Sequence, residues 1–539
     1  MGKTTLVDLP SELIANIFSH FDDVDIFAGR VASRHLERAS FSLFAKRFFR
    51  KKGYMITTPS LQVLKSVAAH EELRPYVQHV WFNPDCFTFG SLDTASTLHS
   101  DFEEVSEPEV PEDCIEQIHV KNNQRSRTAA REEERYRAYS ECIDDYQRLL
   151  HSDEKLADEL TTAFSTLPNL KAVGMRRSDQ HNPWGWSRLK DAIGLDPRQL
   201  GDIPDTPSFM LSGPTQLYIA LMKSLCASEA SIQRLYTDAI EIDNISPSVL
   251  PAEVVRAACE SVLYLEINAT KAWLFTIPTP HGDRFDPFNP AHYGLGLARL
   301  LSSTPKLREL GLMIFPDRKQ SHLIAPQPFR PESWRDSYPY KSLTQVANIT
   351  NLSHLRRIKL EKFTVSPSVL ISLLQPSAPH LTSIKLRHIR LMPEVEGQSS
   401  SGNDPDADKP WKAIFSFLSH SCPKLSYLLM YHLLHSTGSL RFKPRGAPSP
   451  PQDPEDTGAE DIDIEGGFVQ YEHLAIEVGT PHSDPDLQGS DRRAEIKKAR
   501  KAVAERVQAL IDGHWYGDNL FTYSMDDSLW HTDTSDEEW

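Results

Sequence analysis

The sequence predicts an α/β protein with a short helical module at its N-terminus and repeated helix and strand segments behind it. Apolar residues within the first 50 positions recur at helical spacing, and a helix followed by a Leu-rich strand occurs four times after residue 290. The 539 residues suffice for one small module and an extended domain. We therefore expect a module followed by an α/β solenoid.

Three short apolar segments lie within residues 6 to 50, and the acidic turn Asp22-Asp23-Val24-Asp25 separates the first from the second. A module of about 45 residues can bury only a small fraction of its surface. Its large apolar side chains exceed what it can enclose, which points to a partner protein. Such a stripe is also the normal core face of an amphipathic helix, and this alternative stays open.

The segment resembles an F-box, the three-helix module that connects substrate receptors to SCF-type cullin-RING ubiquitin ligases. The residues that match its Leu-Pro-x-Glu start, its Ile-Phe pair and its Asp before the second helix are Leu9, Pro10, Glu12, Ile17, Phe18 and Asp25. The end of the pattern departs from the family. The segment Ala32-Ser33-Arg34-His35-Leu36 keeps the Arg but replaces Val, Cys and Trp.

The resemblance implies that the module binds the small adaptor of the ligase and, through it, a cullin. The side chains expected to contact the adaptor are Leu9, Pro10, Leu13, Ile17, Phe18, Phe21, Ile26, Val31 and Leu36. Leu36 stands where the family has Trp. Because a buried aromatic anchor often carries much of an interface's binding energy, this replacement is expected to weaken the interaction.

Helix and strand patterns repeat in the second half of the chain. The strand-like segment Leu307-Arg308-Glu309-Leu310-Gly311-Leu312 has counterparts that start at Leu355, Leu381 and Leu425, and weaker copies occupy 167–173 and 262–267. The intervals between the four stronger starts are 48, 26 and 44 residues, of which only the second fits a leucine-rich-repeat period of about 20 to 29. The region looks like an irregular leucine-rich-repeat solenoid, with an ordinary α/β domain as the alternative.

Stacked repeats present short parallel strands on a concave face, and we expect that face to hold a protein substrate. The predicted substrate-binding residues are Arg308, Arg356, Lys359, Lys385 and Tyr427. Several are basic although the chain carries a formal charge of −16, so an acidic or phosphorylated substrate is one hypothesis. The alternative is that they are solvated strand residues.

The remaining segments differ in composition. Residues 393–410 and the acidic, Pro-rich stretch after 441 predict disorder, whereas 468–478 alternates like a strand and 490–511 reads as a charged helix. The predicted organisation is 1–50 F-box, 51–165 linking helical and strand region with an acidic loop, 166–440 repeat domain, 441–467 disordered linker, 468–525 strand and helix, and 526–539 acidic tail.

No catalytic residue, metal site or cofactor is predicted. Gly294-Leu295-Gly296 precedes a helix, but Arg299 occupies the place of the third glycine of a dinucleotide fingerprint. His432 and His435 lack a third ligand at metal-like spacing. Trp184 and Trp186, in Asn-Pro-Trp-Gly-Trp, could anchor a partner or close a loop.

Charge and cysteine usage give expectations about location and partners. The net charge of −16 argues against nucleic acid or an anionic membrane as a partner. The six cysteines are dispersed, and no leader or membrane-spanning run is recognisable, so we expect a cytoplasmic or nuclear protein.

These observations favour a non-enzymatic substrate-recognition subunit of an SCF-type ubiquitin ligase. The combination of F-box, irregular repeats and acidic Pro-rich insertions is similar to the F-box families of filamentous fungi. The main alternative is an interaction scaffold without a role in ubiquitination, and an enzyme with an unrecognised site is a third.

Overall fold

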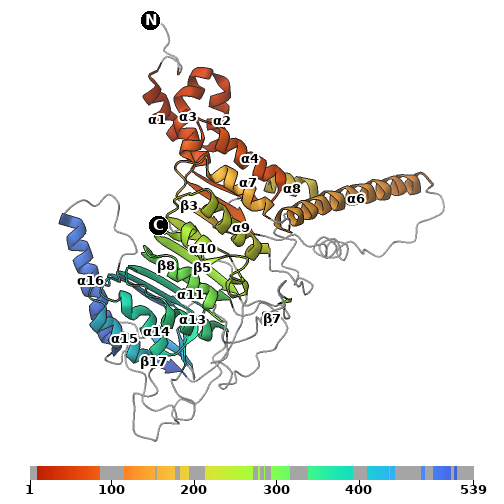
Figure 1. Cartoon of the computed structure of the whole chain (residues 1–539). Helices are drawn as coiled ribbons and strands as arrows, with labels where there is room; N and C mark the ends of the chain where they lie inside the picture. The colour runs from red at the N-terminus through yellow and green to blue at the C-terminus, as the bar shows by residue number, and fades with distance from the viewer. Residues whose placement is uncertain are drawn as a thin grey trace, which may run out of the picture. The chain divides into compact units, whose positions relative to one another are not determined.

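The structure is a computed structural model, and it divides the chain into two compact units (Figure 1). Unit 1 comprises Met1–Glu241, Ile245–Val262 and Trp273–Gly282, and unit 2 comprises Ile242–Asn244, Leu263–Ala272 and Asp283–Trp539. The structure describes residues 6, 9–84, 115–151, 154–176, 182–193, 213–238, 240–270, 277–278, 284–285, 293–315, 338–392, 410–431, 433–435, 438–442, 475–479, 490–511 and 515–518. Of the predicted disordered segments 393–410 and 441–467, residues 393–409 and 443–467 lie outside them, whereas residue 410 begins a helix and residues 441–442 end a strand.

Unit 1 begins with three helices, α1 (Ser11–Ser19), α2 (Asp23–Ala32) and α3 (Arg34–Phe49). The Asp22 carboxylate accepts a hydrogen bond from the Asp25 N–H at 2.8 Å and so caps α2. The Ser33 hydroxyl caps α3 in the same way through the His35 N–H. We call residues 9–49 the N-terminal module.

A parallel sheet follows the module, with strands in chain order: β1 (Lys51–Met55), β2 (His79–Asn83), β3 (Ala172–Met175) and β4 (Arg234–Tyr236). Parallel neighbours need crossover connections, and helices supply them. The helices α4 (Thr58–Ala69), α7 (Lys155–Phe164), α9 (Gly213–Ala227) and α10 (Ala252–Cys259) pack each against the next. A short 3₁₀ helix, η2 (Arg74–Tyr76), leads into β2, and β6 (Ile277–Pro278) also belongs to this unit.

The long helix α6 (Ile115–His151) packs its C-terminal part against α8 (Trp186–Ile193). Trp186 is buried there with Tyr139 and Ile143. Trp184 is partly exposed and lies along the edge of β1, where its N–H donates to the Gly53 carbonyl at 2.8 Å. Trp186 is therefore a core residue, whereas Trp184 closes the edge of a strand.

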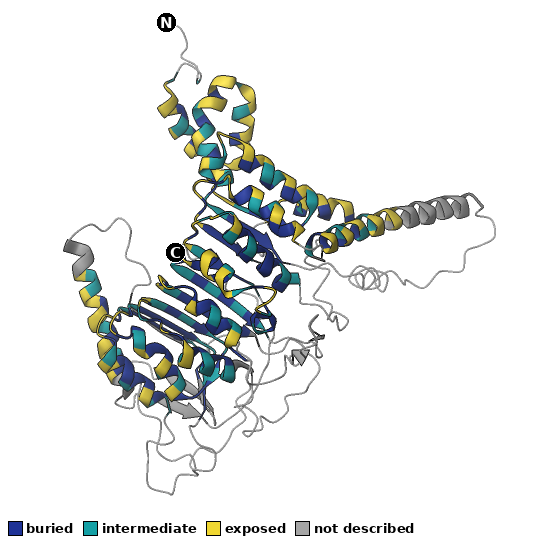
Figure 2. Ribbon diagram, in the orientation of Figure 1, coloured by how far each residue is buried: buried dark blue, intermediate teal, exposed yellow. Residues whose placement is uncertain are grey.

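Unit 2 contains further parallel strands, which pair in chain order: β5 (Tyr264–Thr270), β8 (Glu309–Phe315), β9 (Arg357–Glu361), β11 (Ser383–Arg387) and β13 (Tyr427–Tyr431). An antiparallel strand, β16 (Ala475–Gly479), pairs with β13. The covering helices are α11 (Leu295–Ser302), α13 (Tyr338–Ile349), α14 (Pro367–Leu374), α15 (Pro410–Ser421) and α16 (Ser490–Ile511), each packed on its neighbour. In β5 and β9 buried residues alternate with partly exposed ones, and the helices combine buried with exposed residues (Figure 2).

Unit 2 also contains a smaller sheet, with β10 (Thr364–Val365), β12 (Arg390–Leu391) and β14 (Leu434–His435) in parallel, extended by antiparallel β15 (Gly438–Phe442) and β17 (Trp515–Asp518). Three successive repeats therefore each contribute one strand to both sheets. The residue after the main strand has a positive φ in two of them, 63° at Lys362 and 53° at His388. The other short elements are η4 (Ile242–Asn244), η7 (Gln375–Ser377) and β7 (Arg284–Phe285).

The predicted α/β fold with repeated parallel strands is confirmed, because the parallel strands of the main sheet follow chain order and a helix precedes each of them. The strands start two residues later than the predicted starts. Leu307, Leu355, Leu381 and Leu425 lie just before them and are buried. The strands β1 and β4 were not predicted, because they are short and lack the spaced leucines of the repeated strands.

Candidate functional site

The N-terminal module exposes large apolar side chains. Leu13 is 50% exposed, Val24 75%, Phe27 49% and Val31 88%. Val24, Phe27 and Val31 are separated by three and four residues, so they form one stripe along α2. These four are close together in sequence, whereas the other exposed large apolar residues of the described chain are scattered. Such a concentration marks an interaction surface.

The residues predicted to bind an adaptor divide into three groups. Pro10, Leu13 and Val31 are exposed, and Leu9, Ile17 and Phe21 are partly buried. Phe18, Ile26 and Leu36 are buried with Ile14 in the core of the module.

Leu36 was expected at the partner surface and instead lies in the core, 6% exposed, because the first turn of α3 packs it against α1 and α2. Phe18 and Ile26 were also expected at the partner surface and are also buried in the core of the module. Val24 and Phe27 were not among the predicted adaptor-binding residues, although their i, i+3, i+7 spacing with Val31 indicates a shared helix face.

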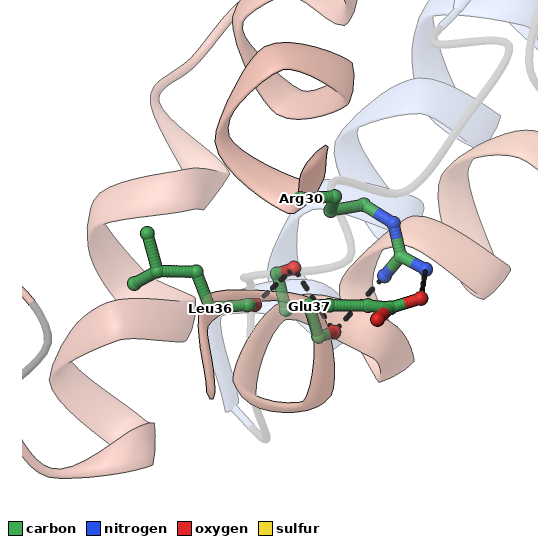
Figure 3. Close-up of polar contacts among 4 residues, drawn as sticks. Arg30, Leu36 and Glu37 are labelled. Atoms are coloured by element: carbon green, nitrogen blue, oxygen red, sulfur yellow. Dashed lines mark hydrogen bonds and ion pairs between the residues drawn. The ribbon is translucent and has the colours of Figure 1, made fainter. Parts of the chain in front are cut away.

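Arg30 joins the second and third helices of the module (Figure 3). Its Nη1 donates to the Glu37 carbonyl at 3.1 Å, and its guanidinium carbon lies 3.9 Å from the centre of the Phe44 ring. Burial lowers the pKa of Arg30, and the nearby Glu37 carboxylate partly opposes this effect. The Ser40 hydroxyl donates to the Leu36 carbonyl at 2.7 Å. The carbonyls of Leu36 and Glu37, in the first turn of α3, therefore each accept a hydrogen bond from a side chain.

The sheet of unit 2 has one face formed by the residues that alternate with its buried leucines and isoleucines, and we call this the open face. The alternation is clear in β9, where Ile358 and Leu360 are buried and Arg357, Lys359 and Glu361 are partly exposed. The strands are in register, so these side chains form rows across the sheet. The charged residues of the open face are Glu266, Glu309, Arg357, Lys359, Glu361, Lys385 and Arg387.

Most charges on the open face are paired across strands. The Arg357 Nη1 lies 3.5 Å from the Glu309 Oε1. The Lys359 Nζ lies 3.4 Å from the Glu361 Oε2 and 3.9 Å from the Glu266 Oε1. These pairs reduce the positive charge that the sequence suggested for this surface.

The five predicted substrate-binding residues are not all on the open face. Lys359, Lys385 and Tyr427 are, and the Lys385 Nζ lies 5.5 Å from the centre of the Tyr427 ring. Both of these are nearly buried, with Lys385 4% exposed. Arg308 and Arg356 are exposed but precede β8 and β9, one position out of phase with the open-face residues. The prediction therefore combined residues of two different surfaces.

The Gly294-Leu295-Gly296 segment has a structural role. The Asp243 carboxylate accepts hydrogen bonds from the N–H groups of Gly294 at 2.6 Å and Gly296 at 2.8 Å, and from that of Leu297 at 3.3 Å. Gly294 has a φ of 82°, and a Cβ there would collide with the Ser342 backbone. A carboxylate thus occupies the N-terminus of α11, where a phosphate would otherwise bind.

Among the residues that the structure describes, no group of three or more His, Cys, Asp or Glu side chains is placed to hold a metal ion. In the same part of the chain, no helix combines the length and apolar character needed to cross a bilayer.

No family model matches the chain, and no curated protein matches it in sequence. Among solved structures, the leucine-rich repeat-containing protein LegL7 from Legionella pneumophila is similar at 13% identity and a TM-score of 0.21. The match covers 53% of this chain and 72% of that one. At so low a score the likeness carries no argument. The strand order and register of the chain itself define it as a protein of parallel α/β repeats with a helical module at the start of the first unit.

Proposed function

We propose that the chain is a non-enzymatic substrate receptor of an SCF-type ubiquitin ligase. The N-terminal module would bind the ligase's adaptor and, through it, a cullin. The α/β repeats would hold a protein substrate, and the basic strand residues suggest that they bind an acidic or phosphorylated segment of that substrate. The receptor would act by raising the local concentration of substrate beside the conjugating enzyme, so that no catalytic side chain of its own is needed.

One observation carries the proposal: the module exposes Leu13, Val24, Phe27 and Val31 within 19 residues. Removing such side chains from water is worth about 1.5 to 3 kcal/mol each. The same 19 residues contain the Ile-Phe pair of the F-box pattern, and its Leu-Pro-x-Glu start directly precedes them. A partner that covers α2 and the start of α1 would account for both the exposure and the pattern.

The test is co-purification of the tagged full chain with the adaptor and the cullin. Leu13→Glu and Val31→Glu change exposed side chains, so the module should remain folded. Each places a charge in the proposed interface, and we expect recovery of the adaptor to fall more than about tenfold. The matched control is Ile349→Glu, because Ile349 in α13 is also 50% exposed but lies in unit 2. Normal recovery of the adaptor by Leu13→Glu and Val31→Glu would remove the basis of the proposal.

The second candidate function is an interaction scaffold that uses the same repeats without promoting ubiquitination. It is favoured by the ion pairs that already neutralise much of the open face, since they reduce the net charge available to attract one charged substrate. The cullin separates the two functions. The ligase requires the cullin to co-purify with the adaptor, whereas a scaffold does not.

A further inference from the structure

The open face has two arginines, Arg357 and Arg387. Arg357 forms an ion pair with Glu309, whereas Arg387 forms none within the described part of the chain. Arg387 ends β11 and pairs in register with Glu361 of β9 and Tyr431 of β13. Within the described residues its Nε–H is buried and has no hydrogen-bond partner. A buried N–H donor without a partner in the protein suits a ligand that accepts hydrogen bonds, such as an anion.

The nearest carboxylate is already engaged by other cations. The Glu361 Oε2 lies 3.4 Å from the Lys359 Nζ, and Glu361 also acts on Lys362. The pKa of Lys362 is lowered by burial and by the Lys359 ammonium, against the opposing effect of Glu361. Lys359 and Lys362 therefore both act on the Glu361 carboxylate, and Glu361 stands in register with Arg387 at the carboxyl ends of β9 and β11.

The backbone fixes this arrangement. Lys362 has a φ of 63°, and its N–H donates to the Arg387 carbonyl at 3.0 Å. The positive φ turns the chain directly after β9, so Lys362 does not continue the alternation of the strand. The two cationic residues are thus joined through their main chains and belong to adjacent repeats.

We propose that Arg387, with Lys362 joined to it through the main chain, forms an oxyanion site at the carboxyl ends of β9 and β11, which takes a phosphoryl group. An arginine offers a planar set of N–H donors that matches phosphate oxygens, and a lysine adds a point charge. The ligand would be either a phosphorylated residue of a partner protein or a free phosphate compound. This inference rests on the proposed function in one respect: both assume that the sheet of unit 2 binds a ligand or partner.

Binding is measured on the purified full chain without the adaptor, so a failure here is distinct from a failure of adaptor binding. One arm measures retention on beads carrying degenerate peptides with a fixed phosphoserine, a fixed glutamate or a fixed serine. The other measures the shift in melting temperature with inorganic phosphate against chloride at equal ionic strength. We expect retention by phosphoserine over serine, a shift with phosphate, or both.

The test variant is Arg387→Met, and the matched control is Arg356→Met, which removes an exposed arginine just before β9. Arg387 is only partly buried and its buried Nε–H has no partner within the described residues, so replacing it by an apolar side chain of similar length should not unfold the protein. We expect Arg387→Met to weaken the phosphate response about ten- to a hundredfold, and Arg356→Met to leave it unchanged.

The two arms distinguish the sources of the phosphoryl group. Retention on phosphoserine beads that depends on Arg387 supports a phosphoprotein, and a response to inorganic phosphate alone that depends on Arg387 supports a small ligand. No binding in either arm, or equal binding by Arg387→Met, overturns the site. Adaptor recovery should be normal for Arg387→Met.

Discussion

Arg30 and Glu37 contact each other twice across the junction between α2 and α3: Nη1 donates to the Glu37 carbonyl at 3.1 Å, and Nη2 lies 3.6 Å from the Glu37 Oε1. The Arg30 side chain is largely buried, and it lies against the Phe44 ring. This contact fixes the angle at which α2 presents Val24, Phe27 and Val31.

Arg30→Ala should loosen the N-terminal module. It removes a charge-assisted hydrogen bond and a cation–π contact, which together are worth about 1 to 3 kcal/mol. The measurement is amide hydrogen exchange in α2 and α3, where protection should fall. Arg38→Ala, an exposed arginine of α3, is the control and should leave protection unchanged. Equal protection in both variants would contradict the role given to Arg30.

Leu36→Trp should destabilise the module, although the family pattern places Trp at this position. Leu36 is buried against Ile14, Phe18 and Ile26, and a larger ring there overpacks the core by about 1 to 3 kcal/mol. The midpoint of chemical denaturation, followed by circular dichroism, should decrease. If Leu36→Trp is as stable as the natural chain and binds the adaptor more tightly, then Leu36 lies at the interface after all.

Gly53→Ala should disturb the sheet of unit 1. The Trp81 ring of β2 lies where a Cβ at Gly53 would stand, so the ring must move. We expect a loss of about 1 to 3 kcal/mol and a change in tryptophan fluorescence. Gly311→Ala is the control, because its Cβ would meet only the flexible Glu266 side chain, at 3.2 Å. Comparable losses in the two variants would argue against the packing of Trp81 on Gly53.

Cys259 and Cys422 should resist alkylation while the protein is folded. Burial raises the pKa of each thiol to about 12. At pH 8 the thiolate fraction is then about a thousandfold below that of an unfolded thiol with a pKa near 8.5. Since the folded pKa is the higher one, stability falls as the pH rises from about 8.5 towards 12. Mass spectrometry after iodoacetamide treatment, with and without denaturant, measures the protection of the two thiols, and the denaturation midpoint at rising pH measures the loss of stability. Rapid labelling of the folded chain would contradict the burial.

Much of the fold could be predicted because its signals are local. The alternation around Leu360 and Leu386 determined which strand residues are buried, and the charged pattern of 490–511 determined α16. Short strands such as β4 lack such a signal, since three residues do not establish a period.

The sequence by itself determined the repeated parallel strands, the helices between them and the apolar character of α1 and α2. The tertiary structure alone decided which of those side chains meet. Lys359 pairs with Glu266, a residue 93 positions away, because the register between strands of different repeats brings them together. The same register places Arg387 beside Glu361 and Tyr431, and the packing of α3 on α1 and α2 buries Leu36 in its module. Charge and hydropathy are properties of single residues, whereas pairing and burial depend on distances that only the folded chain establishes.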